Sequence, residues 1–109
     1  MNPSAEVTNS NLPFVEAFSA VRGDCSFRDL ERRTRDCDPS GNGLSRTYLN
    51  HMARGLTRPT APAMRLIAEA LGIEPEYFAE YRLAAARWQL DERRVGLDAA
   101  LQALAESRP

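Results

Sequence analysis

Hydrophobic residues recur every three or four positions along most of the chain. This is the spacing of α-helices, and no stretch alternates as a β-strand would. The pattern predicts a helix after Pro13, a second beginning at Ser26, a third over residues 46–54 and a fourth over residues 61–71. We therefore expect an all-α protein.

The residue types at the ends of these stretches agree with the predicted boundaries. Ser45 and Thr60 are good N-cap residues for the third and fourth helices, because a hydroxyl can accept a hydrogen bond from a free amide of the first turn. Gly55 and Gly72 stand where glycine commonly ends a helix. A fifth segment begins at Glu74.

The C-terminal region, from about residue 82 onward, is rich in Ala and Leu, which favour helix. Leu97, Leu101 and Leu104 repeat at helical spacing. We expect one or two helices here, with the break near Asp91 or Gly96 if there are two.

The stretch DCDPSGNG, residues 36–43, separates the second and third predicted helices. Its alternating polar residues resemble the start of a calcium-binding EF-hand loop, which ends in a glutamate at position twelve. That position is Thr47, and the next carboxylate is Glu69. We therefore expect a turn rich in Asx and Gly residues, not a calcium site.

The net charge of −1 conceals an uneven distribution. All 14 basic residues are arginine; residues 22–65 hold nine of them against five acids, whereas residues 66–109 hold five against eight. No Asp or Glu occurs between Pro39 and Ala68. A basic middle part indicates a DNA-binding face, although scattered solvated arginines would give the same counts.

Several classes of function have little support in the composition. Two cysteines and one histidine are too few for a zinc site, and no nucleophile–base pair or phosphate-binding loop points to an enzyme. No apolar run reaches the roughly 18 residues of a membrane span, and the polar N-terminus does not resemble a signal peptide. We expect a cytoplasmic protein without a cofactor or metal, whose cysteines are reduced rather than joined in a disulfide.

Helical geometry places hydrogen-bonding side chains on one side of the predicted third helix. At about 100° per residue, Leu49 and Met52 point inward. The side chains that face outward, or that lie at the edges of the outward face, are those of Arg46, Thr47, Tyr48, Asn50, His51 and Arg54. In the major groove, Arg can bind guanine and Asn can bind adenine through paired hydrogen bonds, and Thr can offer its methyl group to thymine. A face with arginine and no acid therefore favours DNA recognition over an ordinary solvated surface.

The run LSRTYLNHMARGLTRPTAPAMRLIAEALGIEPEYF, residues 44–78, resembles the lambda-repressor-like, xenobiotic-response-element (XRE) family of helix-turn-helix regulators. The resemblance rests on the cap at Ser45, the stop at Gly55, the Pro59 link and the IAEALGI motif at 67–73, and it extends more loosely back to Ser26. It implies a five-helix DNA-binding domain, here with an additional C-terminal helix or helices, that binds double-stranded DNA, usually as a homodimer. The turn over residues 36–43 is longer than is usual in the family.

The resemblance also assigns residues. It places base contacts on Arg46, Thr47 and His51, to which the outward face adds Tyr48 and Asn50. It places phosphate contacts around the ends of the second, third and fourth helices, where the candidates are Ser26, Arg28, Ser45, Arg54, Thr57, Arg58 and Thr60.

We expect three parts along the chain: a disordered lead-in over residues 1–11, the helix-turn-helix domain over 12–82 and a helical extension over 83–109. The extension either pairs with a second copy, with Trp88 and Leu90 as contacts, or packs on its own domain and leaves a monomer. The leading function is a sequence-specific bacterial transcriptional regulator at the nucleoid. The alternative is an adapter or antitoxin-like protein that uses the same fold to bind a protein partner.

Overall fold

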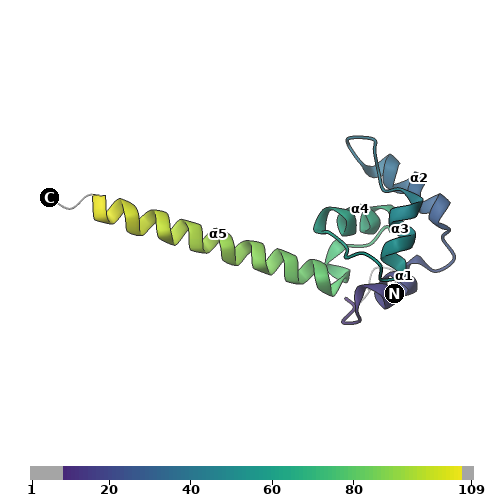
Figure 1. Cartoon of the computed structure of the whole chain (residues 1–109), viewed down its shortest axis with the longest axis horizontal. Coiled ribbons are helices and arrows are strands. Elements are labelled where there is room, and N and C mark those ends of the chain that lie inside the picture. Colours follow the sequence, from purple (N-terminus) through teal and green to yellow (C-terminus); the bar gives the residue numbers. More distant parts are fainter. Residues whose placement is uncertain (1–8, 107–109) are drawn as a thin grey trace, which may run out of the picture.

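The computed structural model describes residues 9–106, which form helices joined by turns, with no β-strand among them. The elements are α1 (Phe14–Arg22), α2 (Phe27–Cys37), α3 (Arg46–Ala53), α4 (Ala61–Leu71), the 3-10 helix η2 (Pro75–Tyr77) and α5 (Ala79–Glu106). The first four helices gather into a small unit, and α5 leaves it as a single long rod (Figure 1). The predicted all-α class is confirmed. None of the described helices combines the length and apolar character needed to cross a membrane.

One hydrophobic core holds the four short helices together. Its largest completely buried side chains are Phe18, Phe78, Leu30, Leu49, Met52, Met64 and Ile67. Burying such a side chain stabilises the fold by about 1.5–3 kcal/mol relative to leaving it exposed. The ring of Phe14 links the two ends of this core, because its centroid lies 5.2 Å from that of Phe18 and 4.9 Å from that of Phe78.

The helix ends follow the local signals in the sequence. α2, α3 and α4 begin directly after the hydroxyl residues Ser26, Ser45 and Thr60, as predicted. α4 ends at Gly72, whose φ of 73° is left-handed and whose amide donates to the carbonyl oxygens of Ala68 and Glu69. The fifth predicted segment is a single 3-10 turn that leads into α5.

The start of α5 is fastened to the N-terminal segment. The carboxylate of Glu80 accepts a hydrogen bond of 3.0 Å from the amide of Phe14, the first residue of α1. Arg82 donates from Nη2 to the carbonyl oxygen of Ser10 and to the side-chain oxygen of Asn11, both at 2.9 Å. Ser10 and Asn11 therefore belong to the folded part rather than to a disordered lead-in, and residues 1–8 lie outside the described residues.

α5 is one unbroken helix of 28 residues, with no break near Asp91 or Gly96. Its composition favours helix, and a single glycine within it costs only about 1 kcal/mol relative to alanine. The boundary expected between residues 82 and 83 falls inside this helix. Residues 85–106 are exposed throughout, so the domain does not bury this part of α5, although Ala85 and Trp88 line a groove with Pro62 and Arg65 of α4.

Cys25 and Cys37 are free thiols in this structure. Desolvation first, and then the negative charges of Glu69 and Asp36, raise the pKa of Cys37 above its ordinary value. A raised pKa keeps the thiol protonated near neutral pH and makes it a poor nucleophile.

Candidate nucleic-acid interface

The turn between α2 and α3 is built around the carboxylate of Asp38. Its two oxygens accept hydrogen bonds of 2.9 Å from the amides of Ser40 and Gly43. The bond from the backbone of Ser40, and then that from Gly43, stabilise the charged form and lower the pKa of Asp38 from its ordinary 3.8. This carboxylate shapes the turn, as expected for an Asx-rich loop. Within residues 9–106, no group of three or more His, Cys, Asp or Glu side chains is placed to hold a metal ion.

Gly43 brings the end of this turn against the backbone of α2. Its φ is +62°, and a Cβ added there would stand 2.6 Å from the amide nitrogen of Arg35. The buried hydroxyl of Thr34 continues the connection, donating to the carbonyl oxygen of Glu31 at 2.9 Å and accepting from the amide of Leu44 at 3.1 Å. Together these contacts determine where α3 begins relative to α2.

α3 turns its polar side chains away from the core. Leu49 and Met52 are completely buried, as helical geometry predicts. Four of the five predicted base-contacting residues line one surface hollow of about 310 Å³ together with Phe27 of α2: Arg46, Thr47, Asn50 and His51. Three of these four are exposed, and Asn50 is half-buried. Residues spaced along one helix therefore form a single accessible face.

Tyr48 differs from the other predicted base-contacting residues. It is half-buried, packs against the hydrophobic core and does not line the hollow. Its amide donates a hydrogen bond of 3.1 Å to the hydroxyl of Ser45. Tyr48 therefore supports α3 from the side of the core, and its prediction as a base contact has no support in this geometry.

One acidic residue lies beside the arginine that opens α3. The carboxylate of Glu31 accepts a hydrogen bond of 2.9 Å from the amide of Arg46 and pairs with the Nε atom of the same residue at 3.2 Å. The segment between Pro39 and Ala68 contains no acid, but the surface that it forms is not acid-free, because α2 supplies Glu31. The Arg46 side chain is 53% exposed and that of Glu31 22%. The end of the guanidinium group therefore still reaches solvent, while Glu31 holds the amide and the Nε atom of Arg46.

Three of the four hydroxyl residues predicted to contact phosphate cap helices. The side-chain oxygens of Ser26, Ser45 and Thr60 accept hydrogen bonds of 3.1, 3.1 and 3.2 Å from amides in the first turns of α2, α3 and α4. Because each oxygen acts as an acceptor, its hydroxyl hydrogen can still be donated to an anion. The remaining free amides and the helix dipole also favour negative charge at such ends.

The other predicted phosphate contacts lie in two separate regions. Arg54, Thr57 and Arg58 belong to the link between α3 and α4, where both arginines are exposed and the threonine is half-buried. Arg28 is exposed in the first turn of α2. The hollow at α3 includes none of them, so the candidate interface consists of one central face with cationic positions beside it.

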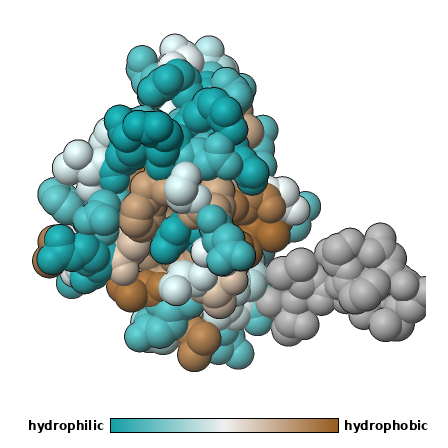
Figure 2. Space-filling model, turned by 90° about the vertical axis from the view of Figure 1, so that its right-hand side faces the viewer, coloured by the Kyte–Doolittle hydropathy of each residue, from teal (hydrophilic) through white to brown (hydrophobic). Residues whose placement is uncertain are grey.

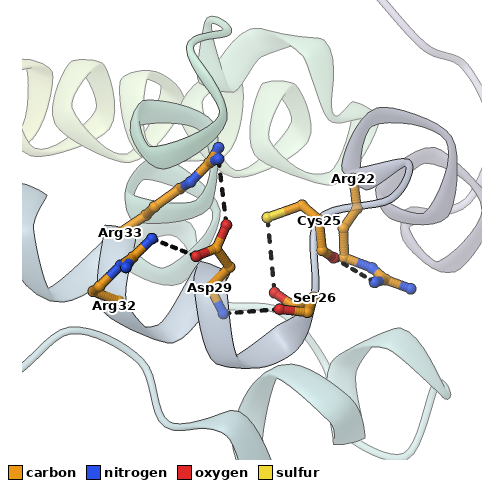
Figure 3. Close-up of polar contacts among 6 residues, drawn as sticks. All are labelled: Arg22, Cys25, Ser26, Asp29, Arg32 and Arg33. Carbon is orange, nitrogen blue, oxygen red and sulfur yellow. Dashed lines mark hydrogen bonds and ion pairs between the residues drawn. The ribbon is translucent and has the colours of Figure 1, made fainter.

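Two further arginines of α2 are partly neutralised within their own helix. Asp29 forms ion pairs with Arg32 and, at 3.4 Å, with Arg33, while its amide donates to the hydroxyl of Ser26 (Figure 3). The count of arginines in the middle of the chain therefore overstates the positive charge available for binding a partner.

Two residues of this surface have no signal as site residues in the sequence. Phe27 stands on the hydrophobic stripe of α2, but its ring lines the hollow and lies 4.3 Å beneath the guanidinium carbon of Arg22. No spacing links Glu31 to Arg46, because their contact is made by folding. The end of the molecule opposite the tip of α5 is mostly hydrophilic, with an apolar area across its middle (Figure 2).

Comparison with known proteins yields one match. Residues 43–78 match the family model described as "Helix-turn-helix", over about a third of the chain. This range contains α3, α4 and η2, and it contains neither α2 nor α5. No curated protein matches the chain. No solved structure matches it either.

Proposed function

We propose that the protein is a sequence-specific transcriptional regulator of the lambda-repressor-like (XRE) family, because residues 43–78 match a helix-turn-helix family model. One observation carries the proposal: the exposed face of α3 gathers Arg46, Thr47, Asn50 and His51 around one hollow within the matched segment. In the proposed complex α3 lies in the major groove. There Arg46 binds guanine and Asn50 binds adenine, each through paired hydrogen bonds.

The backbone of the DNA is held by groups that flank α3. The exposed arginines Arg28, Arg54 and Arg58 neutralise phosphates, and the hydroxyl caps Ser26 and Thr60 donate to phosphate oxygens. Ser45 and Thr57 complete this set. Such contacts provide affinity without sequence preference, and the logarithm of the binding constant falls with the logarithm of salt concentration by about 0.9 for each phosphate neutralised.

Two copies act together in this proposal. A domain of this size contacts few base pairs, so we propose a homodimer that binds two half-sites about 34 Å apart, one turn of DNA. The regulator would act on bacterial operators at the nucleoid, and hence in the cytoplasm.

The exposed apolar side chains of α5 favour a second candidate, an adapter that uses the same fold to bind a partner protein. In that case DNA binding is secondary or absent, and changing the outward face of α3 would not affect function.

Selection of bound sequences from random duplex DNA at two salt concentrations separates the candidates. The regulator is expected to recover a motif and to bind more weakly at high salt. Arg46→Ala should lower the preference for the motif over a scrambled duplex by roughly 5- to 150-fold, which corresponds to the 1–3 kcal/mol of one base contact. Arg58→Ala should weaken binding to both duplexes alike and reduce the salt slope by about 1.

Arg87→Ala is the matched control. It removes the same charge from an exposed position on α5 and should leave both measurements unchanged. Recovery of no motif, together with no dependence on salt, would overturn the proposal and favour the adapter.

A further inference from the structure

The hollow beside α3 has one apolar wall. Its other lining residues, Arg46, Thr47, Asn50 and His51, come from α3, whereas Phe27 is the first residue of α2. Phe27 is half-buried: one part of its side chain packs against the hydrophobic core, and another part borders the hollow. Packing in the core accounts for the first part only. The part of the ring beside the polar side chains of α3 remains available to a partner.

The ring of Phe27 is held in place from the side of α1. The guanidinium carbon of Arg22 lies 4.3 Å from the centroid of the ring, a distance at which a cation is attracted to an aromatic face. Arg22 is itself anchored, because its Nη1 atom donates a hydrogen bond of 2.7 Å to the carbonyl oxygen of Cys25 (Figure 3). Arg22 does not line the hollow. The ring therefore meets the hollow with its edge, or with the face that the guanidinium group leaves uncovered.

The major groove of DNA offers this apolar wall one suitable partner. Base edges in that groove carry hydrogen-bond donors and acceptors, and the apolar group among them is the 5-methyl group of thymine. A phenyl ring beside a donor or acceptor would remove it from water without replacing its hydrogen bonds, which is unfavourable. Beside thymine the ring instead buries a methyl group, a contact that phenylalanine makes in the major groove.

We propose that Phe27 is a base-contacting residue that selects thymine at one position of the operator through its 5-methyl group. The inference rests on the proposed function and adds to it a contact from α2, beside the hydrogen bonds made by α3. Burial of one methyl group should change the dissociation constant by roughly 4-fold, which corresponds to about 0.8 kcal/mol. Cytosine is disfavoured at the same position, because it has no methyl group and presents an amino group in the groove.

Thr47 is the other residue that could make this contact. Its side chain carries a methyl group, and it lines the same hollow. Thr47 is exposed on α3, whereas Phe27 enters the hollow from α2. A variant of each residue is therefore needed to assign a methyl contact to one of them.

Replacement of single thymines by deoxyuridine tests the inference. Deoxyuridine lacks the 5-methyl group and still pairs with adenine, so the change removes only the proposed contact. The wild-type chain is bound to the duplex recovered by selection and to duplexes in which each thymine of the motif is replaced in turn. At least one replacement should raise the dissociation constant by roughly 4-fold. This measurement changes only the DNA and does not depend on the folding of a variant.

Variants of the protein then assign the contact. Phe27→Ala and Phe27→Gln should bind the thymine and deoxyuridine duplexes equally at the sensitive position, because neither variant has the ring. Circular dichroism verifies that the helix content of each variant is unchanged. Thr47→Ser is the matched control, because it removes a methyl group from the α3 side of the same hollow. This control should keep the difference of roughly 4-fold at the position assigned to Phe27.

Three results would overturn the inference. The first is equal binding of all these duplexes by the wild-type chain, and the second is a difference that persists in both Phe27 variants. The third is a difference that Thr47→Ser abolishes and the Phe27 variants retain, which assigns the methyl contact to Thr47. In each case the recovered motif leaves the proposed function standing, whereas failure to recover any motif removes the proposed function and this inference with it.

Discussion

Replacement of Gly43 with alanine tests the turn that positions α3 against α2. A φ of +62° costs alanine about 1–2 kcal/mol. In addition, the new Cβ would stand 2.6 Å from the amide nitrogen and 2.7 Å from the Cα atom of Arg35. Both atoms belong to a helix backbone and cannot swing aside as the end of a flexible side chain can. Displacing the turn or the helix adds about 1–3 kcal/mol, so we expect a total loss of about 2–5 kcal/mol.

Gly41→Ala is the matched control for this prediction. Gly41 has a φ of +77°, but nothing lies within 4 Å of an added Cβ. The control incurs the conformational cost of about 1–2 kcal/mol without the steric clash. In a domain of this size 1 kcal/mol shifts the melting temperature by roughly 4–8 °C. Gly43→Ala should therefore melt at least about 5 °C below Gly41→Ala when unfolding is followed by circular dichroism. Equal melting temperatures would refute the close approach of the turn to α2.

Three further predictions follow from individual contacts. Glu31→Gln should change the free energy of unfolding by only about 1 kcal/mol, because the ion pair with Arg46 is partly exposed. The same change should lower the preference for a selected DNA motif, because it frees Arg46. An unchanged preference in a competitive binding assay would contradict this role of Glu31. Because the pKa of Asp38 is lowered in the folded state, its carboxylate stabilises the fold above pH 3.8, and this stabilisation is lost as the pH falls through the lower pKa of the folded state. The urea midpoint of unfolding should therefore fall between neutral and acid pH for the wild type, and fall less for Asp38→Asn. Glu80→Ala should destabilise the protein by about 1–2 kcal/mol, because the amide of Phe14 loses its acceptor, whereas Glu80→Gln keeps an acceptor oxygen and should melt closer to the wild type.

The sequence by itself determined those features whose physics is local. The caps at Ser26, Ser45 and Thr60 depend on hydrogen bonds to amides three residues ahead, so residue type and position predict where α2, α3 and α4 begin. The outward face of α3 follows from helical periodicity once Leu49 and Met52 are taken as inward. The unbroken α5 was only one of two expected outcomes, because a lone glycine such as that at position 96 weakens a helix without ending it.

Tertiary structure alone decided the contacts between residues far apart in the chain. Glu31 reaches Arg46 across 15 positions, and Glu80 reaches the amide of Phe14 across 66. No periodicity encodes such pairs, because each depends on how two helices pack and not on the turn within one helix. For the same reason the acid-free stretch of sequence became a surface that includes a carboxylate, and Tyr48, at the flank of the outward face, became half-buried against the core.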